Sequence, residues 1–293
     1  MDESILEASH VEFKYQDGTK AIRDLSLSVK KGGKAAFLGP NGAGKTTLFL
    51  HFNGILRPSQ GRVRFAGRDV RYDHASLVDL RKNVGIVFQD PDTQLFSASV
   101  LQEVSFGPFN MGLPEDQVRQ CVDEAMAATE IADLRGRPTH LLSYGQKKRV
   151  SIADILAMDP QVIIFDEPTA CLDPRLALRV MDLLDRLSRG GKTVILSTHD
   201  VDLAYSWADY VFVMKNGEVA GEGLPESIFQ NEKILAQADL KKPWLLEVYG
   251  ELKKKGWLLN GATVPRTKEQ LFEHVSENKS FGHARMLKAE SRR

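Results

Sequence analysis

The sequence predicts an α/β fold in which a parallel core sheet carries an antiparallel β subdomain at its N-terminus and a helical subdomain in the middle of the chain. Three observations lead to this prediction. Residues 4–29 alternate apolar and polar side chains, which is the periodicity of half-buried strands. Residues 84–88, 162–165 and 194–196 are short apolar runs with polar neighbours, as expected of strands buried on both faces. Residues from about 100 to 158 have helical apolar spacing instead.

The N-terminal strands are predicted to form an antiparallel hairpin. Asp17 and Gly18 form a turn signal between the two alternating runs. The apolar positions are Val11, Phe13 and Tyr15 before the turn and Leu25, Leu27 and Val29 after it. The chain is therefore expected to open with antiparallel β structure and to reach its parallel core later.

A glycine-rich loop follows the next apolar run. Residues 35–38 predict a short strand and residues 47–52 continue as a helix, so the loop joins a strand to a helix. The phosphate-binding pattern G-x-x-x-x-G-K-[ST] is matched here by Gly39, Pro40, Asn41, Gly42, Ala43, Gly44, Lys45, Thr46 and Thr47. An ordinary glycine turn before a helix is the alternative, and the complete match between a strand and a helix argues against it.

The chemistry of this loop predicts that the chain binds Mg-ATP and hydrolyses it. Glycines let successive backbone N–H groups point inward, and the following helix presents its positive dipole end to the phosphates. Lys45 supplies a point charge for the β and γ phosphates, and the Thr46 hydroxyl is placed to ligate Mg²⁺.

Two adjacent acids follow the second of the buried apolar runs. Asp166 and Glu167 come directly after residues 162–165. A carboxylate there is costly unless it faces a cation or hydrogen-bond donors. An acid pair after a strand is commonly only a solvated strand end, but the phosphate loop gives a reason for a cation at this place. We expect Asp166 to hold the Mg²⁺ shell and Glu167 to orient and deprotonate the attacking water.

Two helical regions flank the acid pair in the sequence. The first, over about 100–158, has apolar side chains at helical spacing that include Val118, Val122, Ala125 and Met126. The second begins at Asp173 and Pro174, and Gly190 and Gly191 end it. Its apolar face holds Leu176, Val180, Leu183, Leu184 and Leu187.

The end of the chain is predicted to be a hairpin followed by an appendage. Asn216 and Gly217 form the hairpin signal. The apolar pattern thins after about residue 239, so we place an ATPase domain over 1–240 and a small appendage over 241–293. The lysine run 253–255 in the appendage is equally typical of a solvated face.

Composition excludes several classes of protein. The chain has 293 residues, enough for a large α/β domain with an appendage. Its 39 Lys and Arg balance 39 Asp and Glu, so no excess charge indicates nucleic acid as a partner. Cys121 and Cys171 are too few for a disulfide framework, which indicates a reducing interior. No apolar run approaches the roughly 20 residues of a membrane helix, and the acidic N-terminus is unlike a signal peptide.

The order of the motifs carries a family resemblance over about residues 4–238. Residues 142–146, Leu-Ser-Tyr-Gly-Gln, are similar to the signature L-S-G-G-Q of ATP-binding-cassette (ABC) ATPases and precede the acid pair as in that family. The resemblance implies Gln89 as the Q-loop glutamine, Asp173 as the D-loop aspartate, His199 as the switch histidine and Tyr15 as the aromatic ring on adenine. A strand tyrosine or a lone histidine is more often structural, so these two roles depend on the ordered set.

The same resemblance implies a dimer as the hydrolysing state. In this family two ATPase domains dock head to tail, so ATP on Lys45 of one chain is capped by the signature residues of the other, here Ser143, Gly145 and Gln146. Donors on the signature helix supply γ-phosphate contacts that one domain lacks, so hydrolysis waits for closure. His199 is expected to contact the γ-phosphate and the attacking water, and Gln89 to sense Mg²⁺. The second ATPase subunit is expected to be an identical copy, with a heterodimer left open.

Two positions depart from the family pattern. Tyr144 replaces the first signature glycine, and Cys171 replaces the usual glycine of the D-loop. Ser143 and Gly145 remain, so the contacts to the partner's ATP are expected to survive. Cys171 is interpreted as a small residue at a packed interface, because nothing nearby in the sequence offers a resolving thiol.

A narrower resemblance indicates one branch of the family. Residues 88–96 and 104–108 are similar to the ATPases of energy-coupling-factor importers, and the signature aromatic with residues 146–149 is similar to their cobalt branch. This implies two partners, a transmembrane coupling protein and a substrate-binding membrane subunit, and a peripheral location on the cytoplasmic side of the cell membrane. The appendage then resembles the dimerisation segment of that group.

Two alternatives to a cobalt importer remain, an importer of another cargo and a soluble ABC ATPase, and the sequence argues only against the second. Nothing in it distinguishes cobalt from nickel or a vitamin as the cargo of such a motor. A soluble ABC ATPase of DNA repair or translation carries a long coiled-coil insertion or two cassettes, whereas this chain has one cassette and no extended heptads.

Overall fold

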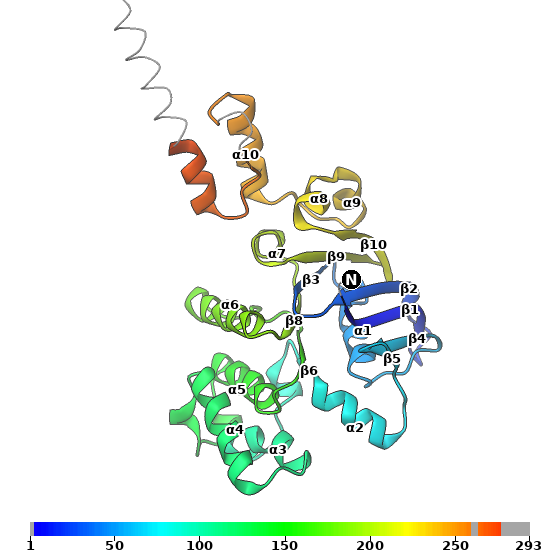
Figure 1. The fold of residues 1–293 in the computed structure, drawn as a ribbon, viewed down its shortest axis with the longest axis vertical. Helices are drawn as coiled ribbons and strands as arrows, with labels where there is room; N and C mark the ends of the chain where they lie inside the picture. Colours follow the sequence, from blue (N-terminus) through cyan, green and yellow to red (C-terminus); the bar gives the residue numbers. More distant parts are fainter. Residues whose placement is uncertain (1–2, 259–262, 277–293) are drawn as a thin grey trace, which may run out of the picture.

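The computed structural model describes residues 3–258 and 263–276, and its centre is a six-stranded sheet in the order β10-β9-β3-β8-β7-β6 (Figure 1). The strands are β3 (Lys34–Leu38), β6 (Val84–Val87), β7 (Val162–Phe165), β8 (Thr193–Ser197), β9 (Tyr210–Lys215) and β10 (Glu218–Gly223). All neighbours pair in parallel except β10, which pairs antiparallel with β9. The predicted parallel core and the late hairpin are both confirmed.

An antiparallel sheet in the order β2-β1-β4-β5 lies beside this core. Its strands are β1 (Ser4–Lys14), β2 (Lys20–Lys30), β4 (Gln60–Phe65) and β5 (Arg68–Asp69). Apolar side chains of this sheet share one buried cluster with helix α1 (Lys45–Phe52) and with β3. Within that cluster Phe37 of β3 stacks on Phe212 and packs edge-to-face on Phe49 of α1, so α1 is fixed against the core sheet. The N-terminal hairpin is confirmed.

The predicted helical subdomain has a core of its own. It consists of α3 (Val100–Asn110), α4 (Glu115–Ala128), η2 (Ala132–Leu134), η3 (Thr139–Leu141) and α5 (Tyr144–Leu156). Val118, Val122, Ala125 and Met126 are buried in its cluster, as their spacing predicted. The subdomain lies at the green, lower end of Figure 1, away from the blue antiparallel sheet. Helix α2 (His74–Asn83) leads from β5 into β6, and η1 (Pro91–Thr93) lies in the segment that joins β6 to α3.

The other face of the core sheet is covered by helices from the second half of the chain. They are α6 (Pro174–Arg189), α7 (Val201–Trp207), α8 (Pro225–Gln230), α9 (Glu232–Gln237) and α10 (Trp244–Lys254). Asp173 caps α6 by accepting the N–H of Leu176, and Gly190 forms its C-cap, which confirms the predicted ends of this helix. Among the described residues, no helix is both long and apolar enough to cross a bilayer.

The described part of the appendage packs on α7 and α8. Leu245, Leu246 and Leu271 belong to the buried cluster that also contains residues of α6, α7 and α8. Arg266 donates to the carbonyl of Tyr205 at 2.8 Å, and its guanidinium also bonds the carbonyl of Ala208. The predicted domain boundary at residue 240 stays a prediction, and residues 277–293 of the appendage lie outside the described residues.

Candidate active site

The phosphate loop joins β3 to α1 at the carboxyl edge of the core sheet. Parallel strands β3, β7 and β8 all end at this edge, which is where open α/β sheets bind ligands. Gly44, with φ of 100°, forms the N-cap of α1, and a Cβ there would lie 2.6 Å from the carbonyl oxygen of Ala21. No side chain caps α1 and no acid lies in its first turn. The helix end therefore presents backbone N–H groups and its positive dipole to an anion.

Lys45 is held by the loop itself. Its ammonium donates to the carbonyl oxygens of Gly39 at 2.6 Å and Pro40 at 3.2 Å, and the side chain is buried. Burial lowers the pKa of Lys45, while the charges of Glu167 and Asp166 act in the opposite direction. A buried cation that is bound only by carbonyls gains a stronger partner when a phosphate enters the loop.

The first acid lies directly against α1. The Thr46 hydroxyl donates to Asp166 Oδ2 at 2.6 Å, and the Ser197 hydroxyl donates to the other carboxylate oxygen. Asp166 is 3% exposed, so this carboxylate depends on those donors. A hydroxyl and a carboxylate at hydrogen-bond distance are the hard oxygen ligands that Mg²⁺ takes, so the residues fit that ion.

The second acid faces the predicted switch histidine. Glu167 Oε2 lies 3.1 Å from His199 Nδ1, and the Glu167 N–H donates to Ser197 Oγ at 3.0 Å. Glu167 is 8% exposed and has a left-handed φ of 46°, whereas the His199 side chain is 74% exposed. Ser197 thus fixes the backbone of Glu167, and the carboxylate of this buried residue lies against an exposed imidazole.

Tyr15 stands at the rim of the same site. Its hydroxyl lies 3.0 Å from Thr47 Oγ1, so the end of β1 is tied to the first turn of α1. The ring packs edge-to-face on Phe13 and is 38% exposed overall. An exposed aromatic face beside a phosphate loop can stack on a base.

The signature residues lie apart from the phosphate loop of their own chain. Ser143 is the N-cap of α5 and forms a capping box with Gln146. Ser143, Gly145 and Gln146 line a cavity of about 370 Å³ together with Asp173, and none of its lining residues belongs to Gly39–Thr47. One chain therefore brings the loop, the acid pair and His199 together but leaves the signature outside that group.

Gln89 follows β6 and is exposed. Its carbonyl oxygen accepts the Tyr144 hydroxyl at 3.1 Å and the Lys148 ammonium at 3.1 Å, both from α5. Burial lowers the pKa of Lys148 to about 8, against the charges of Asp166, Asp90, Cys171 and Glu167. The Q-loop thus lies between the acid edge and the signature helix.

Sequence reasoning missed two residues of this region. Ser197 joins both acids, and Lys148 joins the Q-loop to α5. Ser197 could have been predicted from the sequence, because it ends the apolar run of β8. Strands β7 and β8 are adjacent and parallel, so their ends meet at one edge of the sheet. No sequence pattern indicated Lys148, because its burial depends on how the subdomain packs on the Q-loop.

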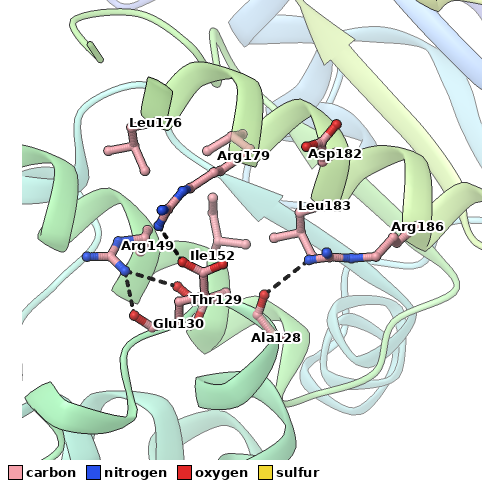
Figure 2. Close-up of a pocket in the computed structure, with 11 residues that line it drawn as sticks. Ala128, Thr129, Glu130, Arg149, Ile152, Leu176, Arg179, Asp182, Leu183 and Arg186 are labelled. Atoms are coloured by element: carbon pink, nitrogen blue, oxygen red, sulfur yellow. Dashed lines mark hydrogen bonds and ion pairs between the residues drawn. The ribbon is translucent and has the colours of Figure 1, made fainter. Parts of the chain in front are cut away.

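A small cavity of about 80 Å³ separates the helical subdomain from α6, and it lies outside the active site (Figure 2). Figure 2 shows arginines that reach the end of α4. Arg149 of α5 bonds the carbonyls of Thr129 and Glu130, and Arg179 of α6 pairs with the Glu130 carboxylate at 2.5 Å. Arg186 of α6 donates to the Ala128 carbonyl at 3.4 Å. The contacts of Arg179 and Arg186 form a second link between the subdomain and the core.

Comparison with known proteins gives matches over most of the chain. Residues 22–170 match the family model described as ABC transporter. An energy-coupling factor transporter ATP-binding protein, EcfA, of Methanocaldococcus jannaschii is 45% identical over 278 residues, 93% of this chain and 99% of that protein. A putative ABC transporter ATP-binding protein of Methanosarcina mazei is 47% identical over 263 residues, and these cover 90% of this chain but 58% of that protein.

Solved structures give the same fold. The structure of cbiO1 from Clostridium perfringens, described as part of the ABC transporter complex cbiONQ, is 46% identical with a TM-score of 0.71 and covers 86% of this chain and all of that one. A dimeric ATP-binding cassette in a post-hydrolysis state with ADP and Pi is 27% identical with a TM-score of 0.70, covering 75% of this chain and 99% of that one.

Proposed function

Since this chain belongs to the ABC transporter family, whose ATP hydrolysis is coupled to transport, we propose that it is the motor subunit of an energy-coupling-factor importer, with cobalt as cargo. The family resemblance carried by the ordered motifs is confirmed by the matches at 45% and 46% identity. The single observation that carries the proposed site is the convergence of Lys45, Thr46, Asp166 and Glu167 at one edge of the core sheet.

ATP binds on the loop Gly39–Thr47 in this proposal. The Lys45 ammonium gives up its hydrogen bonds to the loop carbonyls and binds the β and γ phosphates instead. The adenine stacks on the exposed face of Tyr15. Thr46 and Asp166, with Gln89, would hold Mg²⁺, and the ion would neutralise charge on the phosphates. The N-terminus of α1 supplies the remaining donors.

Hydrolysis starts from a water beside Glu167. The water oxygen attacks the γ-phosphorus, the bond from that phosphorus to the β–γ bridging oxygen breaks, and the water proton passes to the Glu167 carboxylate. Ser197 fixes the backbone of Glu167, and His199 lies 3.1 Å from the carboxylate, where it contacts the γ-phosphate and the water. The products are ADP and inorganic phosphate.

The site is completed by a second copy of the chain. Ser143, Gly145 and Gln146 line a cavity that contains no residue of their own phosphate loop, so they serve the ATP of the partner. The capped N-terminus of α5 directs its dipole at that γ-phosphate. The dimeric cassette that matches at 27% identity supports this assembly.

The partner in the membrane docks beside the Q-loop in this proposal, which places the chain peripherally on the cytoplasmic side of the cell membrane. A groove of about 490 Å³ lies between the helical subdomain and the core sheet, and Phe88, Phe96 and Phe106 are among its lining residues. The rings of Phe96 and Phe106 pack edge-to-face at 4.8 Å although these residues are 66% and 49% exposed. An exposed aromatic patch of this kind fits the apolar face of a helix in a transmembrane coupling protein. The cargo is bound by a separate membrane subunit.

The domain division at residue 240 belongs to the same proposal. Residues 241–293 form an appendage that contributes to dimerisation, and its described part exposes Trp244, Trp257 and Phe272 by 47%, 57% and 62%. Exposed large aromatics are typical of contact surfaces between proteins.

Transport of radioactive metal tests this function. The chain is co-expressed with candidate membrane subunits, and ATP-dependent uptake of cobalt is compared with uptake of nickel. We expect cobalt uptake that disappears when the chain carries Glu167→Gln. Nickel uptake in its place would contradict the cobalt assignment, and ATP hydrolysis without uptake of either metal would contradict a metal cargo.

A further inference from the structure

The signature helix α5 lies along the Q-loop segment through one of its faces. Tyr144, Lys148, Ser151 and Asp154 are spaced by four, three and three residues, so they share a face of the helix. All four contact the segment 88–94: Tyr144 and Lys148 reach its carbonyls, and Ser151 and Asp154 accept from Gln94.

Two donors of α5 converge on one backbone carbonyl. The Tyr144 hydroxyl and the Lys148 ammonium each lie 3.1 Å from the carbonyl oxygen of Gln89, and Lys148 also donates to the carbonyl of Phe88 at 2.7 Å. Lys148 is 0% exposed. A lysine is buried to this extent only when its ammonium is bound, and its hydrogen bonds are then stronger than neutral ones.

The backbone of the Q-loop is bound on its donor side as well. The Phe88 N–H donates to Gln94 Oε1 at 3.1 Å, and Gln94 Nε2 donates to the carbonyl of Ser151 at 2.9 Å. Lys147 of α5 pairs with Asp92 at 2.5 Å in the same segment. The segment therefore has fixed contacts to α5 at its start and at its end.

Tyr144 is one of the two departures from the family signature, and its hydroxyl makes one of these contacts. A glycine at this position would have no side-chain donor for the carbonyl of Gln89, so this contact requires the tyrosine that replaces the signature glycine. The neighbouring signature residue Ser143 lines the cavity that it shares with Asp173, and Tyr144 is not among the lining residues of that cavity.

We propose that Tyr144 and Lys148 are positioning residues that clamp the Q-loop backbone at Phe88 and Gln89 to the signature helix, so that the two move as one unit. A shift of Gln89 at the chain's own nucleotide is thereby passed to Ser143 and Gly145, which complete the partner's site. The clamp thus couples the two ATP sites of the dimer. This inference rests on the proposed function, because it takes the head-to-tail assembly as given.

The coupling is measured from the dependence of ATP turnover on ATP concentration in the full-length chain. We expect a wild-type Hill coefficient near 2, the number of sites, and a coefficient near 1 for Tyr144→Phe and for Lys148→Met. Tyr144→Phe removes a single oxygen at a half-buried position, so it carries the test if Lys148→Met does not fold. ATP affinity, measured in a Glu167→Gln background, is expected to change less than about twofold, because neither residue touches the phosphate loop.

Arg186→Met is the matched control, since it removes a different contact between the subdomain and the core (Figure 2). It is expected to keep the wild-type Hill coefficient. The clamp is overturned if Tyr144→Phe and Lys148→Met keep that coefficient, if Arg186→Met lowers it equally, or if the wild-type value is itself about 1. Failure of the wild-type chain to hydrolyse ATP would instead overturn the proposed function, so the two results are distinguishable.

Discussion

At the scale of single residues, the site depends on a few buried polar groups that hold one another. Asp166 is bound by the hydroxyls of Thr46 and Ser197, and Ser197 in turn accepts the Glu167 N–H. These bonds leave the Glu167 carboxylate with His199 as its side-chain neighbour at 3.1 Å. The pair is thereby fixed before ATP arrives, which is the arrangement that a general base requires.

Glu167→Gln is predicted to separate ATP binding from hydrolysis. The amide keeps the shape of the side chain but cannot accept the proton of the attacking water, so turnover falls roughly 100- to 10,000-fold. Lys45→Ala removes the nearest cation from the phosphates instead, so the Kd for ATP rises by about tenfold or more.

The two variants are compared by calorimetric ATP titration and by phosphate release. A Glu167→Gln chain with substantial turnover would contradict the role of Glu167. Unchanged ATP affinity in Lys45→Ala would contradict the assignment of the phosphate loop.

At the scale of elements, α5 is joined to the segment after β6 by a buried carboxyl. Asp154 of α5 accepts Gln94 Nε2 at 3.2 Å. Burial raises the pKa of Asp154 to about 7; the charge of Glu103 adds to the shift, and the hydrogen bond from Gln94 opposes it. Because the folded-state pKa lies above the unfolded value, this group contributes stability at low pH that is lost as pH rises through 7.

Asp154→Asn is therefore predicted to stabilise the protein at neutral and alkaline pH. The amide stays neutral and keeps an acceptor for Gln94. The stability of the variant relative to the wild type therefore increases as pH rises from 5 to 7 and stays at that level at pH 8. The difference in free energy of unfolding is at most about 4 kcal/mol. Urea unfolding at pH 5, 6, 7 and 8 measures it.

Asp159→Asn serves as the surface control for this experiment. Asp159 pairs with Lys192 at 2.6 Å and its side chain is 83% exposed, so its substitution is expected to change the free energy of unfolding by little. A pH-independent difference between Asp154→Asn and the wild type would show that Asp154 ionises normally in the folded protein.

The elements also show what the sequence could and could not predict. Strands β3, β6, β7 and β8 were predictable because buried parallel strands are short, continuous apolar runs. Helix α6 was predictable because both of its ends carry local signals, an aspartate cap and glycines. These signals lie within a few residues of the structure that they specify.

Contacts between distant segments left no such signal. Residues of the phosphate loop and the acid pair were found from motifs, but the bond between Tyr144 and Gln89 joins positions 55 residues apart. Tyr144 was therefore visible only as a departure from a pattern. The packing of α10 on α7 was hidden for the same reason, because a thinning apolar pattern does not show which surface the remaining leucines cover.

At the scale of the whole molecule, the chain carries two half-sites that it does not join. The phosphate loop, the acid pair and His199 meet at the edge of the core sheet, while Ser143 and Gly145 line a separate cavity with Asp173. In the proposed head-to-tail dimer each half-site would meet its complement, so this arrangement predicts catalysis by residues of two chains.

Mixing of two inactive chains tests this claim most directly. Lys45→Ala removes the cation of the phosphate loop. Gly145→Asp places a negative charge in the cavity that Gly145 lines with Ser143 and Asp173, where the proposed dimer would hold the partner's γ-phosphate. Dimers formed from both chains contain one intact site, because the loop of the Gly145→Asp chain meets the signature of the Lys45→Ala chain. Lys45→Ala mixed with Glu167→Gln is the control. Both residues belong to the half-site with the phosphate loop, so each of the two sites in the mixed dimer carries one of the substitutions.

The chains are co-expressed with different tags, the mixed dimer is purified, and phosphate release is measured. We predict that the Lys45→Ala and Gly145→Asp mixture exceeds either parent by about tenfold or more, while the control mixture stays inactive. A mixture that is as inactive as its parents would contradict a site shared between two chains.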